Sequence, residues 1–168
     1  MTLNNTIEKR VWIKASAEIV YRALTHAKDL EKWFCDRADC TPSEGGELIA
    51  YWKSDKEGQK GCAVFTQIVP YVSLKMLWKG DGRGASPDTS KHVLQYTIKS
   101  KSGMTEVMML DRDDTELDEE TYAFLDRGWN SVLLELKDFC ERKERLLKMR
   151  RNQDSISVLP QDDNSSGN

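Results

Sequence analysis

The sequence lacks an excess of positive charge and a long apolar segment. Its 168 residues contain 25 lysines and arginines against 28 aspartates and glutamates, a formal net charge of −3. Nucleic-acid and anionic-membrane partners usually require an obvious basic excess, so neither is expected. The longest uncharged stretch, residues 61–74, is shorter than the ~20 apolar residues of a membrane span. Because no signal-peptide pattern opens the chain either, the sequence predicts a cytoplasmic protein without a membrane span.

Cysteine and histidine are also scarce. Four cysteines are spread along the chain: Cys35, Cys40, Cys62 and Cys140. Their spacing suits neither a disulfide framework nor paired zinc ligands, so reduced thiols are expected. With His26 and His92 as the two histidines, a metal site would need ligands from distant segments. No metal and no other cofactor is therefore predicted.

Motifs for catalysis are missing as well. The chain contains no G-x-S-x-G elbow, no H-E-x-x-H zinc motif and no P-loop. Neither His26 nor His92 is paired in sequence with an orienting carboxylate, so both are predicted to be exposed rather than catalytic. The acidic residues from Asp111 to Glu120 are interpreted as solvated groups at a helix start, although a carboxylate pair or a cation site is an alternative. Enzymatic activity is thus left open but is not expected.

The apolar pattern divides the chain into strands and helices. Residues 6–14 alternate and predict a strand, and residues 17–25 and 28–34 predict short helices. Five further runs between Gly- and Pro-containing turns predict an antiparallel meander: residues 47–53, 61–69, 72–79, 92–100 and 104–112. The Gly-rich connection at residues 80–90 is predicted to be a mobile loop.

A long amphipathic helix is the last predicted element. Apolar residues recur at helical spacing from Leu125 to Cys140, with acidic residues before them and basic residues after them, as the helix dipole favours. Residues 1–151 are predicted to form one domain whose C-terminal helix extends past the core. Residues 152–168 have no aromatic or basic residue and are predicted to be a disordered tail.

Several short motifs occur in the order and near the spacing of one superfamily. They are Val11-x-Ile13-x-Ala15, Glu18-x-Val20-Tyr21-x-Ala23-Leu24-Thr25, Leu30-x-x-Trp33-Phe34, Gly45-Gly46, Gly61-x-x-x-Phe65-x-x-Ile68-x-Pro70, Leu74-x-x-x-Trp78 and Gly128-Trp129. By these motifs, residues 6–142 resemble the START-like (SRPBCC) superfamily, in the branch named after the C-terminal domain of the heat-shock-protein-90 ATPase activator. Tyr21, where many relatives have Trp, and the basic extension after Glu141 depart from the family pattern.

The resemblance implies an α+β helix-grip fold, also called Bet v 1-like. In this fold a curved antiparallel sheet wraps around the C-terminal helix and leaves a cavity between them. Such cavities in the wider superfamily bind lipids, hormones, polyketides or other apolar molecules. The resemblance therefore implies binding of a hydrophobic or amphipathic, lipid-like small molecule without catalysis, while the fold alone does not fix the function.

Aromatic and methionine side chains supply the candidate ligand pocket. Those predicted to face the grip, together with one leucine of the last helix, are Trp33, Phe34, Trp52, Phe65, Met76, Trp78, Tyr96, Met108, Trp129 and Leu133. Such side chains suit an adaptable apolar pocket. They equally suit a filled core, and both interpretations stay open. Gly128, beside Trp129, is interpreted as a point where the helix approaches other backbone closely.

The alternative function is a protein-interaction module of the chaperone ATPase-activator type. Between Glu141 and Arg151 the helix carries Leu146 and Leu147 among basic residues, which suits a protein partner, a second copy of the chain or an acidic surface. The eukaryotic activator has an additional N-terminal domain, whereas the first strand here begins near Thr6. Full co-chaperone function is therefore not expected.

Overall fold

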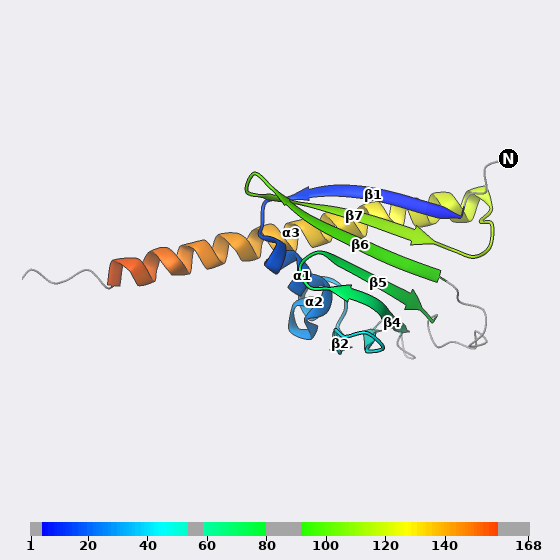
Figure 1. Cartoon of the computed structure of the whole chain (residues 1–168), viewed down its shortest axis with the longest axis horizontal. Coiled ribbons are helices and arrows are strands. Elements are labelled where there is room, and N and C mark those ends of the chain that lie inside the picture. Colours follow the sequence, from blue (N-terminus) through cyan, green and yellow to red (C-terminus); the bar gives the residue numbers. More distant parts are fainter. Residues whose placement is uncertain (1–4, 54–58, 80–91, 158–168) are drawn as a thin grey trace, which may run out of the picture.

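Seven antiparallel strands and three helices make up residues 5–53, 59–79 and 92–157, which the computed structural model describes (Figure 1). In chain order they are β1 (Thr6–Ile13), α1 (Ala17–Thr25), α2 (Ala27–Trp33), β2 (Arg37–Cys40), β3 (Glu47–Trp52), β4 (Gln59–Val69), β5 (Ser73–Trp78), β6 (His92–Lys101), β7 (Met104–Arg112) and α3 (Glu119–Ser157). The strand order in the sheet is β1-β7-β6-β5-β4-β3-β2. Each strand from β2 to β6 therefore pairs with the next one in the chain, and β1 pairs with β7 to form the other edge of the sheet.

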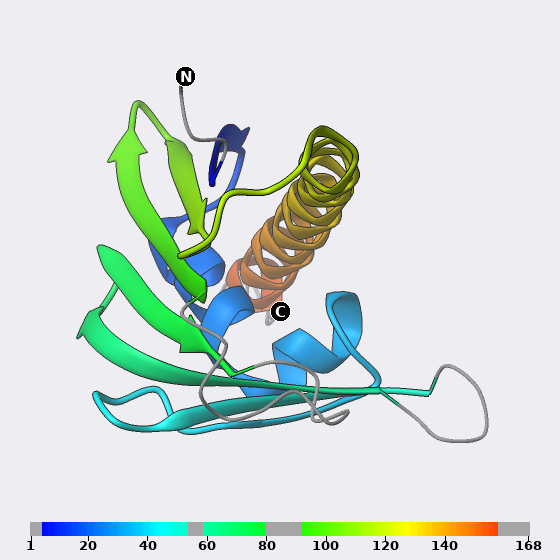
Figure 2. The same cartoon turned by 90° about the vertical axis from the view of Figure 1, so that its right-hand side faces the viewer.

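The sheet curves around the helices, as Figure 2 shows, with α3 lying along its concave side. Period-two alternation gives the strands one apolar face: in β7, Val107 and Met109 are buried and face the core. The matching stripe on α3 includes the buried residues Leu136 and Cys140. Burial of these two apolar surfaces against each other holds the long helix against the sheet.

Capping residues fix where two helices begin. The hydroxyl of Ser16 accepts a hydrogen bond from the backbone N–H of Ile19 at 3.3 Å, as predicted for the start of α1. Just before α3, the carboxylate of Asp118 accepts two hydrogen bonds from Thr121, one from the backbone N–H at 2.8 Å and one from the side-chain hydroxyl at 2.9 Å. These hydrogen bonds to Thr121 lower the pKa of Asp118. For Asp118 the interpretation as an exposed helix-start carboxylate is therefore confirmed.

The predicted strands and short helices agree with the structure to within two residues at each end. One strand was not predicted: β2 is only four residues long, and two of them, Arg37 and Asp39, are charged. The last helix differs most, because α3 continues to Ser157, six residues into the segment predicted to be disordered. The rest of that segment, residues 158–168, and the predicted loop at residues 80–90 lie outside the described residues. No helix in the described part of the chain has both the length and the apolar composition to cross a bilayer.

Gly128 corrects one sequence interpretation. It lies within α3, and a Cβ built at this position would have no atom within 4 Å beyond its own local helix, so Gly128 allows no close approach to other backbone. Glycine costs about 1 kcal/mol relative to alanine inside a helix. Gly128→Ala is therefore expected to raise the free energy of unfolding by about 0.5–1 kcal/mol in urea denaturation. A lower unfolding midpoint would show that the space at this position is needed.

Candidate functional site

A small apolar cavity lies between the short helices, the middle of the sheet and α3. Its volume is about 30 Å³, room for about two water molecules at roughly 10–15 Å³ each. The residues that line it are Leu24, Leu30, Trp33, Phe34, Leu48, Met76, Trp78, Leu94, Tyr96 and Trp129. None of these side chains is a carboxylate, an amine, a guanidinium, an imidazole or a thiol. The cavity therefore offers apolar and aromatic contact with very few polar groups.

Six of the ten predicted pocket residues line this cavity: Trp33, Phe34, Met76, Trp78, Tyr96 and Trp129. The other four lie elsewhere. Phe65 and Leu133 are buried in the core, and Trp52 packs behind Phe34 with their ring centroids 5.3 Å apart. Met108 is 42% exposed on the outer face of β7, where its sulfur lies 3.9 Å from Arg10. The structure thus brings together residues from α2, β5, β6 and α3.

Four leucines complete the lining and were not predicted: Leu24, Leu30, Leu48 and Leu94. They come from α1, α2, β3 and β6, and each is buried. Leucines at buried positions of helices and strands are typical of any core. Only the packing between elements separates a lining leucine from a core leucine, so the sequence contains no signal for them.

Hydrogen bonds hold the aromatic wall in place. The indole N–H of Trp33 donates to the carbonyl of Ala23 at 2.9 Å, and that of Trp52 donates to the carbonyl of Phe34 at 2.7 Å. The Phe34 ring lies between these two indoles, with a centroid distance of 5.3 Å to each. Offset and edge-on ring contacts of this kind are favourable beyond the area they bury. The wall is therefore fixed before any ligand arrives.

Gly61 on β4 provides the space for two indole rings. A Cβ at this position would lie 2.8 Å from the Trp78 ring and 3.1 Å from the Trp52 ring. Gly61→Ala is therefore expected to displace Trp78 and to destabilise the protein by about 1–3 kcal/mol, the usual cost of overpacking. Near-UV circular dichroism should change together with the unfolding midpoint. Gly128→Ala, which meets no neighbour, is the matched control, and equal behaviour of the two variants would contradict the expectation.

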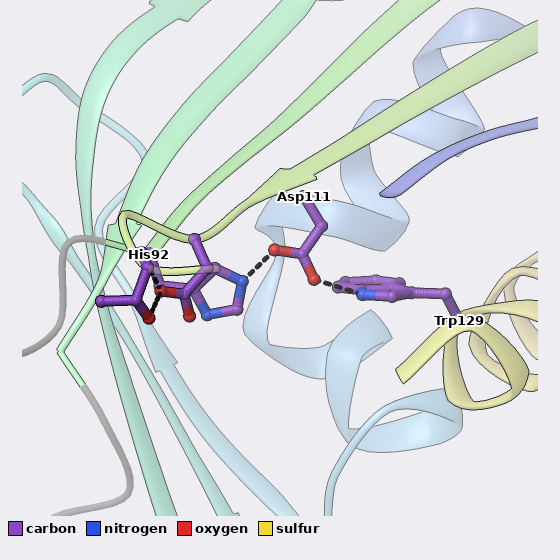
Figure 3. Close-up of polar contacts among 5 residues, drawn as sticks. His92, Asp111 and Trp129 are labelled. Carbon is purple, nitrogen blue, oxygen red and sulfur yellow. Dashed lines mark hydrogen bonds and ion pairs between the residues drawn. The ribbon is translucent and has the colours of Figure 1, made fainter. Parts of the chain in front are cut away.

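A buried carboxylate connects α3 to the sheet. Asp111 on β7 is 4% exposed, and its two oxygens accept hydrogen bonds from Trp129 Nε1 and His92 Nε2 (Figure 3). This overturns two expectations: His92 has an orienting carboxylate, and Asp111 is not a solvated helix-start residue. Val107, Met109 and Asp111 share one face of the strand, and the structure shows that this face is the buried one.

Asp111 also sets the protonation of its neighbours. Burial alone would lower the pKa of His92, but the hydrogen bond and negative charge of Asp111 outweigh burial and raise it. Burial, reinforced by the charge of Asp111, raises the pKa of Tyr96. The Tyr96 phenol therefore stays protonated. Neither Asp111 nor His92 lines the cavity, so their role is to position the Trp129 wall.

The raised pKa of His92 makes stability depend on pH. Its folded-state pKa lies above the ordinary value of 6.5, so the stabilisation is fully present below that value and is lost as pH rises through the folded-state pKa. The free energy of unfolding of the wild type, minus that of His92→Gln, is expected to fall over this window. Urea denaturation between about pH 5 and pH 9 measures it. A difference that is constant with pH would contradict the ion pair.

The cysteines do not form a reactive centre. All four thiols are free, and burial raises the pKa of Cys40 and of Cys140 to about 12. A thiol with so high a pKa is a poor nucleophile at neutral pH. In the part of the chain that the structure describes, no group of three or more His, Cys, Asp or Glu side chains is arranged to hold a metal ion.

The curved antiparallel sheet, the long helix along its concave side and the apolar cavity between them define a START-like helix-grip domain. Residues 14–141 match the family described as Activator of Hsp90 ATPase homolog 1-like protein, and the chain belongs to that family. This confirms the family and the fold class that the sequence motifs implied. No curated protein matches the chain in sequence.

Solved structures share the fold over most of their length. The Aha1 dimer from Colwellia psychrerythraea superposes with a TM-score of 0.67 at 22% identity, covering 81% of this chain and 96% of that chain. A protein from Cytophaga hutchinsonii superposes with a TM-score of 0.70 at 18% identity, covering 85% of this chain and 98% of that chain. A protein from Mesorhizobium loti superposes with a TM-score of 0.67 at 20% identity, covering 82% of this chain and 97% of that chain. At these identities the likeness establishes the fold and not the function.

Proposed function

We propose that the protein binds a small hydrophobic or amphipathic molecule in the cavity and releases it unchanged. The observation that carries this proposal is the cavity itself, since aromatic side chains from α2, β5, β6 and α3 surround it. Protein interiors are otherwise close-packed, and apolar cavities with few polar groups are typical ligand sites. Of the described residues that line the cavity, Tyr96 alone has a titratable group, which favours binding over acid–base catalysis.

The cavity must widen to take a ligand, because about 30 Å³ is far below the roughly 300 Å³ of the smallest usual ligand sites. The wall best able to move is the first part of α3. From Glu119 to Val132 this helix has no fully buried residue, whereas Leu133, Leu136, Phe139 and Cys140 beyond it are buried. Segments without fully buried side chains open at a lower free-energy cost than the core, and opening here also requires breaking the hydrogen bond between Trp129 and Asp111.

A cytoplasmic location belongs to the same proposal. Its support is the set of four free cysteines, which is typical of a reducing compartment.

Titration with isopropylbenzene, an apolar probe without hydrogen-bonding atoms, tests the proposal. The indole N–H signals of the ¹⁵N-labelled protein are followed by NMR. Saturable shifts are expected for Trp78 and Trp129, which line the cavity, and no shift for Trp12 on β1, which does not. The filling variant Leu94→Phe should abolish the shifts. Absence of saturable shifts, or equal shifts at Trp12, would refute binding at this site.

The C-terminal part of α3 supports a second candidate function, an interaction surface for another protein. Figure 1 shows α3 continuing well past the sheet. Leu146, Met149 and Ile156 are each more than half exposed, and spacings of three and seven residues place them on one side of the helix. The Colwellia structure is that of a dimer, and the family is named after an activator of the Hsp90 ATPase, so an interaction role is a reasonable second candidate.

The charge around this surface selects the partner. A groove of about 400 Å³ has an apolar floor of Phe139, Leu146 and Leu147. Its rim is basic: Lys32, Arg142 and Arg150, together with Lys143, whose charge is already paired with Asp29. None of the described residues that line the groove is acidic. A second copy of the chain would bring the same basic rim against itself, which is repulsive. The partner that we propose is therefore an acidic amphipathic helix, with apolar residues for the floor and carboxylates for the rim.

A pair of model peptides tests this surface. Both have leucine at heptad positions a and d; one has glutamate at e and g, the other lysine. The glutamate peptide is expected to bind, with an affinity that falls as salt is added. The lysine peptide is expected to remain unbound. The double variant Leu146→Ser/Met149→Ser, altered at exposed positions, should fold and lose binding. Binding to phosphatidylserine vesicles without peptide binding, or a dimer abolished by the double variant, would overturn the proposal.

A further inference from the structure

Two side-chain donors of the cavity lining, the Trp78 indole N–H and the Tyr96 hydroxyl, form no hydrogen bond with any of the described residues. The indole N–H groups of the lining residues Trp33 and Trp129, in contrast, donate to protein oxygens. Trp78 is only partly buried, whereas Tyr96, on β6, is almost completely buried, with 5% of it exposed. A buried phenol normally finds a partner for its O–H.

The Tyr96 hydroxyl must border the cavity. Within the described part of the chain, no fully enclosed side-chain nitrogen or oxygen lacks a hydrogen-bond partner. The unpartnered Tyr96 oxygen is therefore in contact with open space. Since the side chain is almost completely buried and lines the cavity, that open space is the cavity. An unmade hydrogen bond there costs about 1–3 kcal/mol, so water or a ligand atom has a reason to occupy the position.

The surroundings decide what kind of atom that is. The phenol is protonated, because burial and the nearby carboxylate of Asp111 disfavour the phenolate, so Tyr96 has an O–H to donate. Among the described residues no cationic side chain lines the cavity, so an ionised ligand group would be desolvated without a counter-charge from them. The matching group is a neutral oxygen acceptor.

We infer that the ligand is a neutral, mainly apolar molecule that carries a carbonyl oxygen, as in a ketone, an ester or an amide, and that this oxygen accepts a hydrogen bond from Tyr96. This inference rests on the proposed function, because it names the ligand class of the same cavity. It excludes free carboxylic acids in their ionised form from the interior of the site.

Two probes of nearly the same shape separate the inference from the proposed function. Isopropylbenzene has no acceptor, and acetophenone has a carbonyl oxygen in place of a methyl group. Their dissociation constants are measured by indole NMR for the wild type and for Tyr96→Phe. The dissociation constant of acetophenone is expected to rise about 3- to 10-fold in Tyr96→Phe, the effect of losing one neutral hydrogen bond. Isopropylbenzene should bind both proteins equally. Comparing each probe with itself removes the difference in their solubility in water.

Tyr21→Phe is the matched control, because Tyr21 on α1 does not line the cavity and its substitution should change neither constant. Thermal denaturation verifies that each variant is folded. Equal weakening of both probes in Tyr96→Phe, or no weakening of acetophenone, overturns the inference and leaves the proposed function standing. Benzoate binding that depends on Tyr96 also overturns it, because the ligand would then be an anion. Failure of both probes to bind the wild type overturns the proposed function itself.

Discussion

Asp111→Ala is expected to lower the free energy of unfolding by about 3–5 kcal/mol, the usual cost of removing one partner from a buried ionic contact. Two donors lose their acceptor at once: the imidazole of His92 and the indole of Trp129. The carboxylate is also the direct polar connection between β7 and the first part of α3. Urea denaturation at about pH 6, where His92 is charged, measures the loss most sensitively.

Asp111→Asn separates the charge from the shape. An amide oxygen can still accept the indole N–H of Trp129, but it provides no negative charge for His92. The asparagine variant is therefore expected to lose clearly less stability than the alanine variant, and to lose the pH dependence assigned to His92. Trp129→Phe removes one donor and leaves the ion pair, so its pH dependence should persist. An alanine variant as stable as the wild type would show that Asp111 does not hold α3 in place.

The same buried carboxylate shows where sequence reasoning stopped. β7 contains two adjacent methionines, Met108 and Met109, and only one of them can face the core, because side chains alternate along a strand. Placing Met108 in the pocket puts Asp111 on the outer face, in agreement with its interpretation as a solvated residue. The structure shows the opposite parity, with Met109 and Asp111 inside. Sequence alone did not show which face of β7 is buried, because each face carries one methionine together with a charged residue: Met108 with Arg112, and Met109 with Asp111.

Elements with a local signal were predicted well, and elements that depend on their partners were not. α1 was predicted with its correct ends, because Ser16 caps it and its apolar residues recur at helical spacing. β2 has no such pattern and exists because it pairs with β3, Ala38 opposite Ala50. The six aromatic and methionine lining residues were predictable because few residue types suit such a wall. That the Tyr96 hydroxyl has no hydrogen-bond partner among the described residues could not be predicted, because it depends on the positions of all the atoms around it.

Lys143→Met is expected to destabilise the protein by about 3 kcal/mol. Lys143 forms an ion pair with Asp29, which joins α3 to α2 near the point where α3 leaves the sheet. The side chain of Asp29 is 5% exposed, so loss of the lysine leaves an unpaired carboxylate in the interior. The first turn of α2 provides some compensation through its dipole. Urea denaturation at neutral pH is the appropriate measurement.

The reciprocal change should cost less, and this asymmetry distinguishes a buried ion pair from a surface one. In Asp29→Leu the remaining partner is Lys143, whose side chain is 24% exposed and long enough to turn its ammonium group into water. The double variant Asp29→Leu/Lys143→Met leaves no charge behind and should recover most of the loss of Lys143→Met, because apolar pairs often replace buried ion pairs without penalty. If the two single losses were equal and simply additive, the pair would be two independent contacts. A larger loss in Lys143→Met, reversed by the second substitution, would establish that the cost comes from the stranded Asp29 carboxylate.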